Sequence, residues 1–145
     1  MDREIKSRGI PIDKPKDSGE FVYGYYLPFY TPSDTHPRFK IEHRIYTYLE
    51  EANCSIHNEV HPDTVGQYRG KDDDDKEIYD GSLITFIPKD ASALIQQIAE
   101  VYYCEKRKMT CVKSTAWDCP LFNCKKIEVI GNVHTEVHDK EQNNG

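Results

Sequence analysis

The stretch from Val60 to Phe86 constrains the fold most, because it reads as a strand, a charged loop, a tight turn and a second strand. The loop Lys71–Lys76 holds four adjacent aspartates, whose charges repel one another and stay hydrated. Asp80-Gly81 offers the positive-φ geometry of a tight turn, and Leu83–Phe86 is rich in strand formers. We therefore expect two strands of one sheet, with the aspartates as a hydrated loop between them.

The residues before this stretch also favour strands. Glu20–Leu27 alternates aromatic side chains with a period of two, which is typical of a strand. Pro28–Pro37 contains three prolines and is expected to be an exposed, turn-rich excursion. Phe39–Leu49 and Ser55–Val60 are extended segments joined by a short polar connection, and they predict a β-hairpin.

The residues after Phe86 combine one helix with further strands. Asp90 can cap a helix near residues 90–99, in which Leu94, Ile95 and Ile98 form one stripe. Of the remaining segments, Val101–Cys104 and Met109–Val112 predict two strands joined by a charged hairpin turn at Glu105–Lys108. Lys125–Val133 predicts a final strand. The fold class is therefore mainly β with one short helix. Residues 139–145 are polar and are expected to form a disordered tail.

Length and charge limit the organisation and the partners. The chain has 145 residues, which suits one domain over residues 1–138, or two β lobes at about 1–60 and 61–138. A net charge of −6 argues against a general nucleic-acid binder, which needs a basic face. Since no apolar run approaches the roughly 18 residues of a membrane span, we expect a soluble intracellular protein without a membrane partner.

The sequence offers no recognisable catalytic motif. It contains no H-E-x-x-H metal motif, no G-x-S-x-G nucleophile elbow and no glycine-rich phosphate loop. Five cysteines are present, and free thiols are the favoured interpretation because no two of them are separated by only two residues. A zinc site from the last four is the alternative: Cys104, Cys111, Cys119 and Cys124. We expect that the protein is not an enzyme and that it binds no cofactor and no metal.

One basic cluster is compatible with nucleic-acid binding. Lys106, Arg107 and Lys108 occupy the tip of the predicted hairpin, and Tyr102 and Tyr103 precede them. Basic side chains can contact phosphates while aromatic rings stack on bases. The alternative is a charged hairpin tip above tyrosines that pack in the core. Both interpretations remain open at the level of sequence.

Five segments together resemble a known family. They start at Arg3, Gly19, Pro62, Lys76 and Ile127 and read R-E-I-K-S-R, G-E-F-V-Y-G-Y-Y-L, P-D-T-V-G-Q-Y-R-G, K-E-I-Y-D-G-S-L-I and I-E-V-I-G-N-V-H. In this order they resemble the YopX family of small proteins encoded by bacteriophages, prophages and mobile elements. The resemblance covers nearly the whole chain. It implies a mainly β fold with an SH3-like barrel portion and the cytoplasm of a bacterial host, and it implies no biochemical activity or functional residues.

Two departures from the family pattern bear on structure. Arg69 stands where Thr is common, and Ser82 replaces an acidic residue that follows the glycine of the turn. If that acidic residue bonds the turn backbone, the Ser82 hydroxyl can do so more weakly.

These observations favour a protein that acts by binding. We expect a non-enzymatic accessory protein of a phage or mobile element, whose partner is a phage or host protein that contacts sheet edges and aromatic surface. The alternative is a small barrel that binds nucleic acid through residues 106–108. A homo-oligomer is compatible with both, because exposed edge strands can pair.

Overall fold

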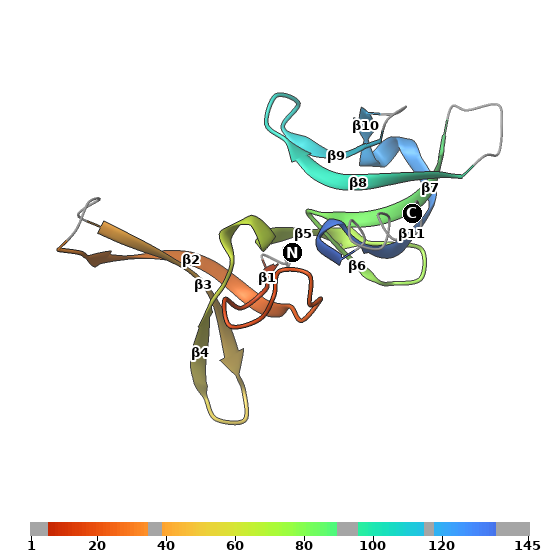
Figure 1. Cartoon of the computed structure of the whole chain (residues 1–145). Coiled ribbons are helices and arrows are strands. Elements are labelled where there is room, and N and C mark those ends of the chain that lie inside the picture. Colours follow the sequence, from red (N-terminus) through yellow and green to blue (C-terminus); the bar gives the residue numbers. More distant parts are fainter. Residues whose placement is uncertain (1–5, 35–38, 90–95, 115–117, 136–145) are drawn as a thin grey trace. The chain divides into compact units, whose positions relative to one another are not determined.

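The computed structural model describes residues 6–34, 39–89, 96–114 and 118–135. Strands dominate it, so the prediction of a mainly β fold is confirmed (Figure 1). The chain divides into two compact units, Met1–Gln67 and Tyr68–Gly145. The tail at 139–145 and the first six residues of the predicted helix, 90–95, lie outside the described residues.

The first unit is an antiparallel sheet with the strand order β4-β3-β2-β1-β5. Its elements are β1 (Ser7–Gly9), β2 (Val22–Pro32), β3 (Phe39–Leu49), β4 (Cys54–Glu59), a 3-10 turn η1 (Pro62–Thr64) and the start of β5 (Gly66–Lys71). The predicted hairpin of β3 and β4 is confirmed by a continuous register. Its small core contains Ile10, Ile45 and Val60, each at most 1% exposed.

Strand β2 is longer than the sequence suggested. Pro28–Pro32 continues the strand and pairs with Phe39–His43, so the prediction of a turn-rich excursion is wrong for these residues. Gly24 makes the pairing possible closer to the centre of the sheet, because a Cβ there would lie 2.0 Å from the carbonyl oxygen of Tyr46. Figure 1 shows β2 and β3 extending together beyond the other strands of the first unit.

The second unit holds a five-stranded antiparallel sheet with the order β10-β9-β8-β7-β11. Its elements are β6 (Glu77–Tyr79), β7 (Ser82–Pro88), β8 (Gln97–Cys104), β9 (Met109–Lys113), β10 (Asp118–Pro120), a 3-10 turn η2 (Leu121–Asn123) and β11 (Cys124–Asn132). The rest of β5 pairs with β6. The core cluster of this unit contains Ile78, Ile84, Phe86, Ala99, Val101, Val112 and Cys124.

Two further expectations need correction. Gln97–Ala99, the described end of the predicted helix at 90–99, begin strand β8 and pair with β7. The reason is a period-two pattern, since Ala99 and Val101 are buried while Ile98 is 51% exposed, and β7 offers a partner strand. The strand orders among the described residues are open, so no SH3-like barrel closes there.

In the stretch from Val60 to Phe86, the strands, the loop and the tight turn are confirmed, but the expectation of two strands of one sheet is wrong: β5 and β7 belong to different sheets, and β6 lies between them in the sequence. The acidic loop also needs a correction. Gly81 has a φ of 88° in the turn, and the Ser82 hydroxyl accepts a 2.9 Å hydrogen bond from the backbone N–H of Tyr79. Asp72 is only 7% exposed, so the expectation that all four aspartates stay hydrated is wrong for this residue. Its carboxylate accepts hydrogen bonds from the backbone N–H groups of Asp74, Lys76 and Val129 at 2.8–2.9 Å.

Candidate functional site

The predicted basic cluster lies at the tip of the hairpin between β8 and β9. Lys106, Arg107 and Lys108 are all exposed, and Lys108 has a left-handed φ of 58° that closes the turn. The turn is held by a 2.8 Å hydrogen bond from the Lys108 N–H to the Cys104 carbonyl oxygen. The structure therefore brings the three basic residues together, as the sequence predicted.

An acidic residue from β10 changes the charge of this hairpin. Arg107 Nη1 lies 3.1 Å from Asp118 Oδ1, and the Tyr102 hydroxyl donates a 2.6 Å hydrogen bond to the same oxygen. Lys113 Nζ lies 4.9 Å from the centre of the Tyr102 ring. The hydrogen bond from Tyr102 is the largest of the effects that hold the pKa of Asp118 below its usual value. A basic group and a tyrosine of this face are thus already engaged by a carboxylate of the same unit.

The cysteines do not assemble into a metal centre in the part of the chain that the structure describes. Cys54, Cys104, Cys111, Cys119 and Cys124 are all free thiols. No three His, Cys, Asp or Glu side chains among the described residues are placed to hold one ion. Burial is the main cause that raises the pKa of the Cys124 thiol to about 12, which makes this thiol a poor nucleophile at neutral pH.

The largest exposed apolar surface belongs to the first unit. Among the residues that the structure describes, eleven of the fourteen exposed large hydrophobic side chains lie in this unit, which also has the smaller core. Most of them lie on β2, β3 and β4. Because a sheet normally buries at least one face against a second layer, such exposure marks an interaction surface more often than it marks an ordinary monomer surface.

The two faces of the β2–β3–β4 sheet differ in charge. Side chains at directly paired positions share a face, so even positions of β2 and β4 share one with odd positions of β3. This uncharged face carries no Asp, Glu, Lys or Arg from Tyr26 to Pro32, from Phe39 to Leu49 or from Cys54 to Asn58. The charged side chains of the three strands lie on the opposite face: Lys40, Glu42, Arg44 and Glu59.

Only part of the uncharged face is covered. Ile45, at its centre, is 0% exposed, whereas Tyr30, Phe39 and Ile41 toward one end are 62%, 64% and 46% exposed. Ile56 and Leu49 at the other end are 47% and 37% exposed. The opposite face has its own exposed apolar side chains, although one of them, Phe29, lies under the guanidinium of Arg44 at 3.9 Å from the ring centre.

One end of this sheet is only two strands wide. The last residue pair that includes β4 is Arg44 opposite Glu59, and Val60 then donates one hydrogen bond to the His43 carbonyl oxygen. Apart from that bond, Pro28–Pro32 and Phe39–His43 pair only with each other. We call these two segments the β2–β3 arm. An isolated two-stranded ribbon is at best marginally stable in water. The arm therefore combines exposed apolar side chains with little support from the other strands of its sheet.

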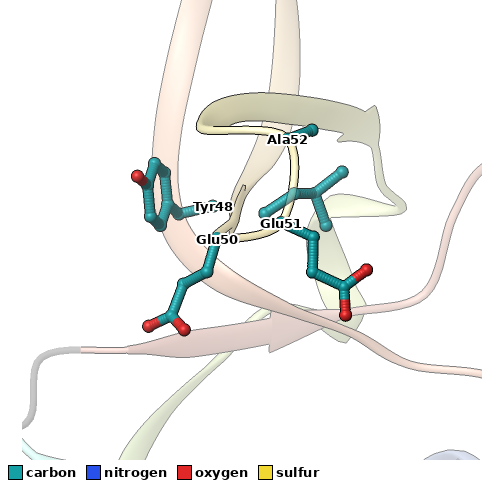
Figure 2. A pocket seen from close by; sticks show the side chains of 5 residues that line it. Tyr48, Glu50, Glu51 and Ala52 are labelled. Carbon is teal, nitrogen blue, oxygen red and sulfur yellow. The ribbon is translucent and has the colours of Figure 1, made fainter.

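A pocket lies at the tip of the hairpin between β3 and β4. Its volume is about 380 Å³, and it is lined by Tyr48, Leu49, Glu50, Glu51 and Ala52. Figure 2 shows the carboxylates of Glu50 and Glu51 extending outward from the turn. Exposed carboxylates beside an aromatic ring can receive a cationic side chain, but the pocket brings together no nucleophile and base of a catalytic site.

Sequence reasoning missed the arm because it treated Pro28 and Pro32 as turn signals. The spacing of the two prolines by four residues was the available signal, because it places both on one side of a strand. The register shows that this side is the outer edge of β2. The carbonyl oxygen of His43 is bonded to Val60, so the backbone groups of His43 point away from β2. In an antiparallel ladder the directly paired residue, Pro28, then points its backbone groups away from β3, as do the other even residues of β2. A proline at such a position, which lacks an N–H, removes no hydrogen bond between β2 and β3.

Comparison with known proteins gives one match. A family model described as YopX protein matches residues 26–137, which extend from β2 through β11. Neither the curated proteins nor the solved structures that were compared contain a match. Within the described residues, no helix is long and apolar enough to cross a bilayer.

Proposed function

The chain belongs to the YopX family, and on this premise we propose that it is a non-enzymatic accessory protein of a bacteriophage or mobile element that binds another protein. It acts in the cytoplasm of the bacterial host. Its binding surface is the uncovered part of the β2–β3–β4 sheet. The partner is a phage or host protein.

The observation that carries the proposal is the β2–β3 arm. Two paired strands expose Phe29, Tyr30, Phe39 and Ile41 at 42–64%, and no described element of the first unit forms a layer over them. Hydrophobic and aromatic side chains of this kind form the centres of protein interfaces. Burying them against a partner gains free energy at roughly 25 cal/mol per Å² of apolar surface, before the cost of association.

Affinity capture with paired variants tests this proposal. Ile41→Lys places a charge on the arm, and Ile98→Lys is the matched control, because Ile98 is a similarly exposed isoleucine on a strand of the second unit (51% against 46%). From host cells that carry the element, the wild type and Ile98→Lys are expected to retain the same partner. Ile41→Lys is expected to retain at least about tenfold less of this partner, because binding would remove the charged lysine from water. Equal capture by both variants would refute the assignment to the arm.

Nucleic-acid binding by Lys106, Arg107 and Lys108 is the alternative function, and the Asp118 carboxylate disfavours it. The Asp118 carboxylate, 3.1 Å from Arg107 Nη1, offsets the positive charge of Arg107 and would repel a phosphate beside it. We expect no mobility shift of single- or double-stranded DNA or RNA at low salt, where electrostatic binding is strongest. A shift that disappears when all three residues are changed to Glu would favour the alternative instead.

A further inference from the structure

Strand β4 is an edge strand that lacks the usual protection against pairing. It lies at the end of the sheet, and its six residues, Cys54–Glu59, keep a continuous register with β3. It contains no Pro, no Lys and no bulge, which are the devices by which proteins block edge strands. Four of its side chains in succession, from Cys54 to His57, are exposed.

The other outer edges among the described strands are protected. The arm edge of β2 carries Pro28 and Pro32. Strands β6 and β10 have three residues each, and β10 includes Pro120. Strand β11 shifts register twice against β7. Strand β4 thus differs from each of these edges in offering a regular run of backbone groups.

The direction of these backbone groups follows from two hydrogen bonds. The Val60 N–H donates to the His43 carbonyl oxygen, toward β3, whereas the Glu59 carbonyl oxygen accepts from the Ile12 N–H, on the outer side. Because backbone groups alternate along a strand, Ser55 and His57 also direct theirs outward. Of the described residues, Ile12 bonds this edge at Glu59, and none bonds the outer backbone groups from Ser55 to His57.

The side chains around β4 indicate which residues a strand added at this edge would need. On the uncharged face, Ile56 and Leu49 are exposed, so a residue paired opposite Ile56 would be apolar. The two ends of β4 are acidic, with Glu59 at one end and the pocket residues Glu50 and Glu51 at the other. Tyr48, which is 56% exposed, offers an aromatic ring beside the pocket.

We propose that β4 binds an extended segment of a partner protein as an added antiparallel strand, in which apolar residues alternate with Lys or Arg. The apolar residues lie beside Ile56, and a basic residue at the hairpin tip enters the pocket between Glu50 and Glu51. This inference rests on the proposed protein-binding function and names the kind of partner segment.

A second copy of the chain fits this edge less well. Two β4 strands paired about a two-fold axis through His57 would place Glu59 of each copy opposite Ser55 of the other, next to its Glu50 and Glu51, although the outer carbonyl oxygen of Glu59 already accepts from the Ile12 N–H. Like charges brought together in this way oppose pairing, and the net charge of −6 per chain adds to the repulsion. A basic strand meets attraction at both ends of β4.

Amide resonances of the isotope-labelled full chain provide the test, with three acetylated hexapeptides as probes. Val-Lys-Val-Lys-Val-Lys is expected to shift the Ser55 and His57 amides. Val-Lys-Pro-Lys-Val-Lys has the same charge but lacks a ladder N–H, and Val-Glu-Val-Glu-Val-Glu has the opposite charge. Both are expected to bind at least about fivefold more weakly.

Two protein variants sharpen the result. Ser55→Pro removes an outward N–H that β3 does not use, so the sheet is expected to remain while the Lys peptide no longer binds; Ser55→Ala is its control. Should Ser55→Pro not fold, Glu50→Gln/Glu51→Gln keeps the backbone and is expected to weaken the Lys peptide about fivefold.

Three results would overturn the proposal: equal binding of the three peptides, no change at β4, or a dimer of the wild type that Ser55→Pro abolishes. These results are separate from the capture experiment. If the peptides fail at β4 while capture still depends on Ile41, strand addition is refuted and the proposed function stands. If the peptide binds at β4 while Ile41→Lys captures as the wild type does, the arm assignment fails and strand addition stands.

Discussion

Asp72 shows how one side chain can convert an unfavourable acidic run into an ordered loop. Burial raises the pKa of its carboxyl, but hydrogen bonds from the N–H groups of Val129, Lys76 and Asp74 outweigh burial and leave the pKa below its ordinary value. The neighbouring residue takes part through its backbone, since the Asp73 N–H donates to the Ile127 carbonyl oxygen at 3.1 Å. The ionised carboxylate therefore links the β5–β6 loop to β11.

Replacing this carboxylate tests its contribution. Asp72→Asn is expected to lower the free energy of unfolding at pH 7 by about 1–3 kcal/mol, because buried N–H groups lose a charged acceptor. Asp73→Asn, with an exposed side chain, should change it by less than about 0.5 kcal/mol. Urea titrations at several pH values measure both.

The pH dependence of the same variant has a definite sign. The pKa of Asp72 is lowered by folding, so its stabilisation is fully present above the ordinary pKa of an aspartate and is lost as pH falls through the lowered value. The wild type and Asp72→Asn should therefore converge in stability at acid pH. A difference that stays constant down to pH 2 would show that the charge of Asp72 is not involved.

At the scale of elements, the prolines of β2 protect its outer edge and leave its pairing with β3 intact. Pro28 and Pro32 occupy two of the outward positions of the arm, where they withhold hydrogen-bond donors from any approaching strand. The arm is thereby directed toward contacts through its faces.

Restoring those donors should make the arm associate with itself. Pro28→Val/Pro32→Val retains β-forming residues and adds two outward N–H groups beside exposed aromatic side chains. Sedimentation velocity is expected to show concentration-dependent oligomers of this variant at concentrations where the wild type and Pro15→Val, a loop control, do not change. Identical sedimentation of all three proteins would contradict the edge argument.

The sequence predicted the elements whose structure is set by neighbouring residues and missed those set by distant residues. Alternation located the β3–β4 hairpin, and turn residues located the Asp80-Gly81 turn. The bond from Ser82 to its own turn was expected from the family resemblance, in which an acidic residue stands at this position. All three features are set by near neighbours. The failures depend on distant partners: β7 recruits Gln97–Ala99 into a strand, and Asp72 is buried by β11. The pairing of Arg107 with Asp118 likewise joins residues from β10 and the β8–β9 hairpin, which the linear pattern does not relate.

At the scale of the whole molecule, apolar burial is divided unequally between the two units. The second unit holds the cluster around Phe86 and Val101, whereas the first has Ile10, Ile45 and Val60 and most of the exposed apolar side chains. Local stability follows buried apolar contacts.

Hydrogen exchange should reveal this difference. Amides of β7, β8 and β9 are expected to exchange at least about a hundredfold more slowly than those of the β2–β3 arm, because opening the arm exposes little additional apolar surface. A bound partner should slow exchange in the arm selectively. Equal protection of the arm and of β8 in the isolated protein would contradict this account of its stability.

The position of β11 in the chain affects how the protein is made. One pairing partner of β7 comes from residues 124–132, as do the Val129 N–H that bonds Asp72 and the Ile127 carbonyl oxygen that accepts from the Asp73 N–H. The second unit therefore cannot close until these residues have left the ribosome. The first unit is complete at Gln67 and emerges earlier. During synthesis the nascent chain therefore presents the uncovered apolar sheet of its first unit before the second unit is complete, so a molecule that binds this sheet could do so while translation continues.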